Sequence, residues 1–364
     1  MPSRPLSFRC LQPHNHGIDL IRIVAMSMVV AMHMLMNNMG VVRGTASPAA
    51  RVLIRFFYVE TFVCVNLFVL VTGWLYAVRT PKIRRLLELA CTVLFFDVGL
   101  RLVVCPLTEM PFRWDILVKE HWFWNAYLAL VLLVPVLNAG LAGLNRRWGC
   151  GNTLRFVIAV SLAFGIVPIS GIGAGRSIGW FVCLYLTGAQ LRLSESSIPF
   201  PDRRKMLLAG VAFPVVSVAF AMVLMHLSKV NAYCIVEYFQ SPPLYLSSIA
   251  WFLWLCRIEV ARAPGFLRKA ANASFSVYLV HMAYATSPVF FSFSAWVVNH
   301  ASGPCGGYAV IPAVAVAVVA VYVAGVLLDA IRRAVFRLFH IESVCNLFER
   351  RLLVILFPPF RPPV

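Results

Sequence analysis

Apolar residues dominate this chain in long runs that short polar connections separate. Most runs match the roughly 20 residues that a helix needs to cross the hydrocarbon core of a bilayer. Ten such runs can be placed, at residues 18–37, 52–77, 86–105, 122–138, 154–170, 177–193, 207–227, 241–258, 272–298 and 308–330. The pattern predicts an all-α polytopic membrane protein with about ten transmembrane helices.

The composition supports this prediction. Of the 364 residues, 61% are hydrophobic and 13% are charged, and the mean hydropathy is +0.82. Soluble domains are closer to half apolar. So few charged residues cannot cover a surface that faces water, and we expect a multi-pass protein of the cell (plasma or inner) membrane, surrounded by lipid. The sequence shows no internal repeat and no separate soluble domain.

The basic residues indicate how the chain is oriented. The net charge is +18. Lys and Arg are concentrated in alternate connections, at residues 79–85, 146–155, 192–205, 257–269 and 332–361. Because this bias marks cytoplasmic loops, both termini are predicted to be cytoplasmic, and the basic character needs no nucleic-acid partner. The expected domains are a cytoplasmic tail at 1–17, a membrane domain at 18–330 and a basic amphipathic cytoplasmic tail at 331–364.

The first apolar run, "GIDLIRIVAMSMVVAMHM", contains three ionisable residues, Asp19, Arg22 and His33. Eleven helical steps from Arg22 to His33 return within roughly 20° of the same face and rise about 16 Å. Asp19 precedes Arg22 by three positions and shares that face. Ionisable groups inside a membrane span are costly, so this stripe predicts a functional polar seam. The alternative is a local Asp19–Arg22 pair at the interface, with His33 as an ordinary interior histidine.

Several stretches resemble the membrane-bound acyltransferase-3 family. "IDLIRIVAMSMVVAMHM" resembles the opening span of that family, whose signature is Arg or Lys, ten further residues and His. "CVNLFVLVTGWLY" (64–76) resembles its second span, with Thr72 in place of the usual Ser. The following basic loop, "KIRRLL", has Lys82-x-x-Arg85 where the family often has two Arg. "WFVCLYLTGAQL" and "NASFSVYLVHM" resemble the sixth and ninth spans, so the resemblance covers nearly the whole chain.

The resemblance implies an acyltransferase. Such an enzyme would move an acetyl or similar short acyl group from acyl-CoA, chiefly acetyl-CoA, to a hydroxyl of a surface polysaccharide or lipid-linked sugar. No spacing of Cys and His in the sequence suits zinc, so no metal is expected. Some family members carry an extracytoplasmic domain, and for this chain we expect any such partner to be a separate protein. A polytopic transporter or exporter of a glycan or small molecule is the alternative. The Arg-to-His spacing and the basic loop favour the enzyme.

The implied reaction needs a base, because a sugar hydroxyl is a poor nucleophile until it loses its proton. Neutral imidazole suits this task, so His33 is the candidate base, or the residue that carries the acyl group covalently. Asp19 occupies the family's acidic position. It lies about 21 Å from His33 along a straight helix, so another helix must supply the partner of His33. Glu60, at a similar predicted depth in the second span, is the candidate.

The coenzyme carries several phosphates, which guanidinium groups bind well. Arg22, Lys82, Arg84 and Arg85 are predicted near the inner face and are candidates to bind them. Ordinary inner-loop topology explains the three loop residues equally well. On the ninth span, Tyr278 and His281 are three positions apart and share a face. They are candidates to line the path of the thioester, although His281 could instead bond a neighbouring helix.

Overall fold

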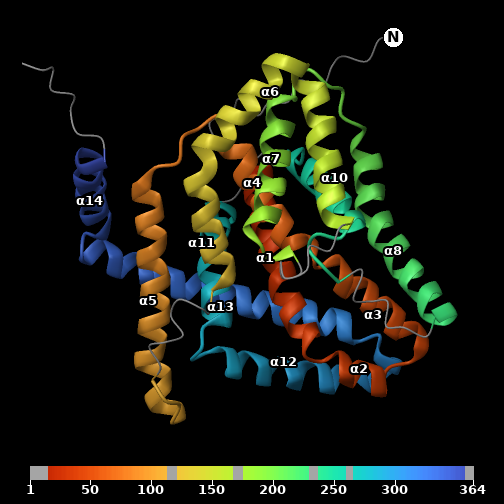
Figure 1. The fold of residues 1–364 in the computed structure, drawn as a ribbon. Helices are drawn as coiled ribbons and strands as arrows, with labels where there is room; N and C mark the ends of the chain where they lie inside the picture. The colour runs from red at the N-terminus through yellow and green to blue at the C-terminus, as the bar shows by residue number, and fades with distance from the viewer. Residues whose placement is uncertain (1–14, 113–120, 167–174, 229–236, 260–264, 357–364) are drawn as a thin grey trace, which may run out of the picture.

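The computed structural model describes residues 15–112, 121–166, 175–228, 237–259 and 265–356, and within these residues it contains helices and no strand. Figure 1 shows their arrangement. The helices are α1 (His16–Met36), α2 (Met39–Thr45), α3 (Pro48–Glu60), α4 (Val63–Tyr76), α5 (Ile83–Thr108), α6 (Trp122–Ile166), α7 (Ile178–Leu193), α8 (Arg203–Ser228), α10 (Pro242–Cys256), α11 (Gly265–Met282), α12 (Ser287–Ser302), the short η2 (Pro304–Gly307), α13 (Val310–Leu338) and α14 (Ile341–Leu356).

The predicted all-α membrane architecture is confirmed. Six helical segments of the described chain are long and apolar enough to cross a membrane, and α7 and α10 are shorter apolar helices. The number ten and the cytoplasmic location of both termini stay predictions.

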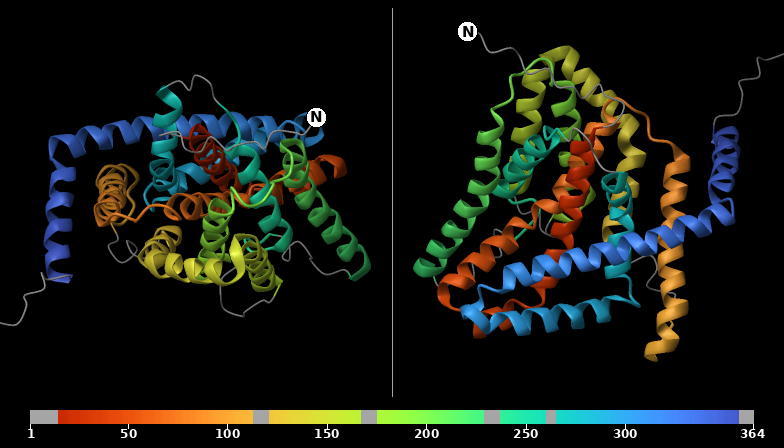
Figure 2. Two further views of the ribbon diagram at one scale, coloured as in Figure 1. Left: turned by 90° about the horizontal axis from the view of Figure 1, so that it is seen from above. Right: turned by 180° about the vertical axis from the view of Figure 1, so that it is seen from behind.

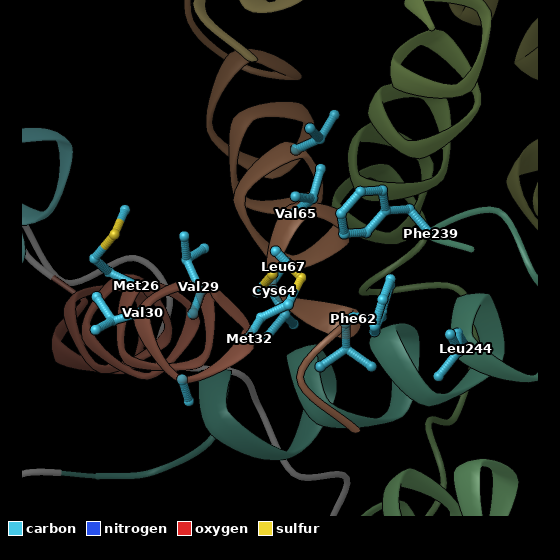
Figure 3. Packing of buried hydrophobic residues seen from close by; sticks show 14 of the residues in the cluster. Met26, Val29, Val30, Met32, Phe62, Cys64, Val65, Leu67, Phe239 and Leu244 are labelled. Carbon is cyan, nitrogen blue, oxygen red and sulfur yellow. The ribbon is translucent and has the colours of Figure 1, made fainter. Parts of the chain in front are cut away.

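The helix α1 lies at the centre of the molecule. Its first turn is capped by Asn15, whose side chain accepts a hydrogen bond from the Gly17 amide at 2.8 Å. Such a cap satisfies one of the amide groups that a helix start leaves without a partner. α1 contacts α4, α10 and α11. Figure 3 shows the apolar packing of α1 and α4, where Met32 and Val65 belong to the same buried cluster.

Two glycines bring α4 and α7 into backbone contact. A Cβ atom on Gly73 would lie 2.2 Å from the Tyr185 carbonyl oxygen, and one on Gly188 would lie 2.3 Å from the Leu70 carbonyl oxygen. Each glycine therefore accommodates the backbone of the other helix. Small residues at such crossings are typical of helix packing in membranes. The glycines of the two family-like stretches, 64–76 and 180–191, thus have a structural explanation.

A buried amide joins three helices beside this contact. The indole Nε1 of Trp180 donates to Asn66 Oδ1 at 3.0 Å, and Asn66 Nδ2 donates to Ser248 Oγ at 3.0 Å and to the Phe239 carbonyl oxygen at 2.8 Å. Asn66 and Ser248 are fully buried. The network fixes α4, α7 and α10 relative to one another, in a region that borders the candidate site.

Four of the predicted spans differ from the structure. The second is divided into α3 and α4, because the chain forms a tight turn at Thr61. The runs at 122–138 and 154–170 form the two arms of α6, which bends at Gly149 with φ 75° and ψ 160° (top of Figure 1). Residues 167–170 lie outside the described part of the chain.

The predicted ninth span, 272–298, is wrong as a single helix. α11 ends at Met282 and α12 begins at Ser287. Pro288 lies in the first turn of α12 and has no amide proton, so a helix cannot continue through it without losing a hydrogen bond. The Thr286 hydroxyl donates to the Val280 carbonyl oxygen and lies 3.3 Å from that of Ala283, which satisfies carbonyl groups that the end of α11 exposes.

The helices α5, α13 and α14 form the edge of the molecule. α13 crosses behind α5, part-way along its length, in the view of Figure 1, and α14 stands beside α5 at the outermost position (Figures 1 and 2). The buried Asp329 of α13 accepts a hydrogen bond from Ser276 of α11 at 2.6 Å and pairs with Arg332 at 2.8 Å. We refer to α5, α13 and α14 together as the peripheral helices.

Candidate active site

A cavity of about 290 Å³ lies between α1, α4, α6 and α11, close to the centre of the molecule. Aromatic and aliphatic side chains form most of its wall, with a few hydroxyl and amide groups among them. Leu89 of α5 also reaches the wall, as do Arg176 and Phe239 from the segments that precede α7 and α10. We call this space the central cavity. Its volume suits a narrow chain better than a whole nucleotide.

Arg22 and His33 both line the central cavity, as the predicted polar seam requires. Since α1 is an unbroken helix between them, they are separated by about 16 Å along its axis. Tyr76 and Tyr127 also line the cavity and lie close enough to Arg22 to interact with it electrostatically. Arg176 likewise lies close enough to His33 to interact with it electrostatically. The cavity therefore has an Arg22 end and a His33 end.

His33 is hydrogen-bonded to His281, with 3.1 Å between Nδ1 of His33 and Nε2 of His281. His281 is buried, and its Nδ1 lies 2.6 Å from the Val277 carbonyl oxygen. A carbonyl can only accept, so the Nδ1 of His281 carries a proton. In a neutral ring the Nε2 of His281 is then an acceptor, and His33 donates from Nδ1. This order leaves the lone pair of His33 on Nε2.

Asp19 does not form the local pair with Arg22 that was the alternative interpretation of the seam. It is 2% exposed, and its Oδ2 lies 3.8 Å from Nδ1 of His16. Arg22 has no ion pair with any residue that the structure describes. A guanidinium in the wall of an apolar cavity, with no carboxylate beside it among the described residues, is suited to an anionic ligand.

Glu60 does not meet His33, contrary to the sequence-based expectation. It lies at the end of α3, where the indole Nε1 of Trp251 in α10 donates to its Oε1. It is buried and does not line the central cavity. The predicted depth of Glu60 in the membrane did not show which neighbouring helix its side chain faces. The break between α3 and α4 determines that orientation. The helix partner expected for His33 is His281 instead.

The predicted coenzyme-binding residues divide into two groups. Tyr278 lines the central cavity, and His281 lies directly behind His33. Lys82, Arg84 and Arg85 lie at the start of α5 and are not among the lining residues. Arg84 contacts Glu88 of α5 and Glu342 of α14, each at 3.2 Å, and Arg85 contacts Glu88 at 2.9 Å.

The structure adds Arg176 to the site, a residue that the sequence did not identify as part of it. The Arg176 guanidinium lies 5.5 Å from the ring centre of Trp122, and both side chains line the His33 end. Behind Tyr278, whose ring centre is 5.6 Å from that of His121, the buried His121 Nε2 lies 2.7 Å from Asp97 Oδ1. No signal in the sequence marked Arg176 as a site residue.

A family model described as an acyltransferase domain matches residues 15–330 of this chain. Neither a curated protein nor a solved structure matches it. The matched segment contains all of the residues that line the central cavity. The family model covers most of the sequence, so the resemblance seen in the sequence is confirmed: the chain belongs to the acyltransferase-3 family of membrane acyltransferases.

Proposed function

We propose that this acyltransferase moves an acetyl or similar short acyl group from acyl-CoA to a hydroxyl of a surface polysaccharide or lipid-linked sugar. The observation that carries the proposal is the central cavity, which has Arg22 at one end and His33 at the other. A thioester held at the Arg22 end can extend toward the imidazole. The acceptor can approach from the His33 end, on the far side of an inner membrane in which both termini are cytoplasmic.

The donor would bind with its phosphates outside the cavity and its pantetheine arm inside. Arg22 supplies a cation at the entrance, and Tyr76 and Tyr127 provide hydroxyl groups nearby. The separation of about 16 Å between Arg22 and His33 is comparable to the reach of an extended pantetheine arm. Lys82, at the start of α5, is exposed and adds positive charge near this entrance, where Leu89 of the same helix lines the wall.

His33 would act as the general base. Its Nε2 takes the proton of the acceptor hydroxyl while the oxygen attacks the thioester carbonyl. The C–S bond then breaks, and the proton passes from His33 to the departing CoA sulfur, so that the ester and free CoA form. His281 holds the ring of His33 through Nδ1 and thereby keeps the lone pair on Nε2. This scheme gives Glu60 and Asp19 no part in proton transfer.

The acceptor end is aromatic and cationic. Trp122 and Phe123 line the cavity there, together with Arg176 and Phe239. Flat aromatic faces suit the apolar face of a sugar ring, and the indole and guanidinium edges can donate hydrogen bonds. This composition is the reason to propose a glycan hydroxyl as the acceptor.

The test measures transfer from radiolabelled acetyl-CoA into the glycan and lipid-linked sugar fractions of membranes that contain the full chain. The His33→Ala variant should lower the transfer by about 10²- to 10⁴-fold. His226→Ala, which removes an exposed histidine of α8, is the matched control and should transfer at the rate of the unmodified protein. Undiminished transfer by His33→Ala would refute the proposed role of His33. Export of unlabelled glycan without any transfer would favour a transporter.

A further inference from the structure

A second and larger cavity, of about 770 Å³, lies among the peripheral helices and the start of α11. Its wall is strongly basic. Five cationic side chains line it: Arg85, Lys269, Arg332, Arg333 and Arg337. Among the residues that the structure describes, two carboxylates share the wall, those of Glu88 and Glu342. We call this space the basic cavity.

Part of this charge is neutralised within the protein. Asp329 pairs with Arg332 at 2.8 Å and with Arg333 at 3.2 Å, and Glu88 pairs with Arg85 at 2.9 Å. Lys269 and Arg337 are exposed and form no ion pair with any described residue. The cavity thus retains cations from two helices, α11 and α13, that no described carboxylate neutralises. Such cations are suited to bind an anion from outside the chain.

The basic cavity is separate from the central cavity and largely outside the family domain. The two cavities share no lining residue. Arg332, Phe336 and Arg337 line the basic cavity but follow residue 330, where the match to the family model ends. The site is therefore a feature of this chain's C-terminal helices.

The surroundings of the basic cavity are apolar and peripheral. Three large apolar side chains nearby are exposed. Leu338 at the end of α13 is 73% exposed, Phe339 just after α13 is 64% exposed, and Leu347 of α14 is 53% exposed. α14 is the outermost helix in every view (Figures 1 and 2). A phosphate group placed among the cations would thus have exposed apolar side chains close by. This combination matches a lipid, which carries a phosphate and hydrocarbon chains together.

We propose that the basic cavity binds the phosphate headgroup of an anionic phospholipid from the surrounding membrane. Lys269 and Arg337 contact the phosphate, with Arg333 beside them, and the acyl chains lie against the exposed apolar residues of α13 and α14. A soluble nucleotide would satisfy the cations and would leave those apolar residues uncovered. The bound lipid ties α14 to α5 and α11 at the membrane surface.

Native mass spectrometry of the full chain in detergent, titrated with phosphatidylglycerol or phosphatidylcholine, tests this proposal. The unmodified protein should bind phosphatidylglycerol at one preferred site and phosphatidylcholine far more weakly. The double variant Lys269→Gln and Arg337→Gln should weaken the first phosphatidylglycerol bound by about tenfold or more, since each basic residue near such a headgroup contributes roughly 1 kcal/mol. Neither residue forms an ion pair with the described residues, so the variant should keep its fold.

The matched control is the double variant Arg268→Gln and Arg350→Gln. It removes two exposed cations, one from α11 and one from α14, and neither residue lines the basic cavity. It should bind phosphatidylglycerol as the unmodified protein does. Equal losses in both double variants would mean unspecific charge attraction and would overturn the proposal. Displacement of the lipid by adenosine 3′,5′-bisphosphate at similar concentrations would also overturn it, because the cavity would then be a nucleotide site.

Discussion

The central cavity and the peripheral helices both contain buried or half-buried charges, but they treat them differently. Among the peripheral helices, charged groups have partners of opposite charge within 3.2 Å. Arg84 pairs with Glu342, and Asp329 pairs with Arg332 and Arg333. In the central cavity, Arg22 and His33 have no carboxylate partner among the residues that the structure describes. His33 is held by another imidazole, and the rest of the wall is mostly aromatic and aliphatic.

This difference separates structural charges from functional ones. Paired charges at a protein edge contribute little to stability. Because each group neutralises the other, no ligand is needed to account for their presence. An unpaired ionisable group in a membrane span costs free energy that the fold does not recover, so a ligand or a reaction is the reason to keep it. We expect substitutions in the central cavity to change catalysis and those at the periphery to leave it nearly unchanged.

After the loss expected for His33→Ala, the largest effect should come from Arg22→Gln. Loss of a charged contact to a phosphate corresponds to roughly 1.5–3 kcal/mol. The kcat/KM for acetyl-CoA should therefore fall by about tenfold to a hundredfold. Arg350→Gln, which removes an exposed cation from α14, should change it less than twofold. Steady-state kinetics with varied acetyl-CoA make the comparison. Similar losses in the two variants would mean that general positive charge, and not the central cavity, attracts the donor.

Gly73→Ala should come next, through packing rather than chemistry. The new methyl group would meet the backbone of α7, and overpacking of this kind costs about 1–3 kcal/mol. Gly99→Ala in α5 is the control, because a Cβ there meets no atom within 4 Å and alanine favours a helix. Thermal unfolding in detergent should show a lower Tm for Gly73→Ala alone. A Tm unchanged by Gly73→Ala would contradict the close approach of α4 and α7.

His281 offers a test of the hydrogen bond that positions His33. His281→Leu removes the acceptor for Nδ1 of His33, whereas the side-chain oxygen of His281→Gln can still accept. We expect His281→Leu to lower kcat by about tenfold more than His281→Gln, a difference of roughly 1.4 kcal/mol, with little change in KM. Equal values of kcat in the two variants would show that His281 only fills space.

The smallest effect should come from Glu342→Gln. The Glu342 side chain is 71% exposed and lies 3.2 Å from Arg84. Exposed pairs contribute about 0–1 kcal/mol, so the free energy of unfolding should fall by less than about 1 kcal/mol and the transfer rate should stay the same. Denaturant unfolding and the acetyl-CoA assay would measure both. A strong loss of transfer would show that the peripheral helices take part in catalysis.

The sequence predicted the features that depend on a single regular helix. The 11-residue spacing from Arg22 to His33 specified a common face, and both residues line one cavity because α1 is unbroken. The sequence could not predict which helix approaches that face. Glu60 was assigned to His33 from its depth alone, but the break after α3 directs it to Trp251. His281 was recognised as a candidate, although its role depends on the packing of α11 against α1.

The remaining differences arise where local geometry interrupts a hydrophobic run. Hydropathy could not show that the run at 272–298 divides at Thr286, nor that one positive φ at Gly149 joins two runs into a bent helix. Arg176 escaped prediction because its neighbours Trp122 and His33 are distant in sequence. Its position depends on how the segment before α7 returns to the cavity.

The most direct test of the account is photo-crosslinking with an acyl-CoA whose short acyl chain carries a diazirine. The label should be mapped by peptide sequencing in membranes that contain the full chain. If the thioester reaches His33 through the central cavity, the label should be found at its His33 end, on Met32, Phe123 or Tyr278, and excess acetyl-CoA should prevent it. Label confined to α5, α13 and α14 would contradict the account, because the acyl group would then never enter the central cavity.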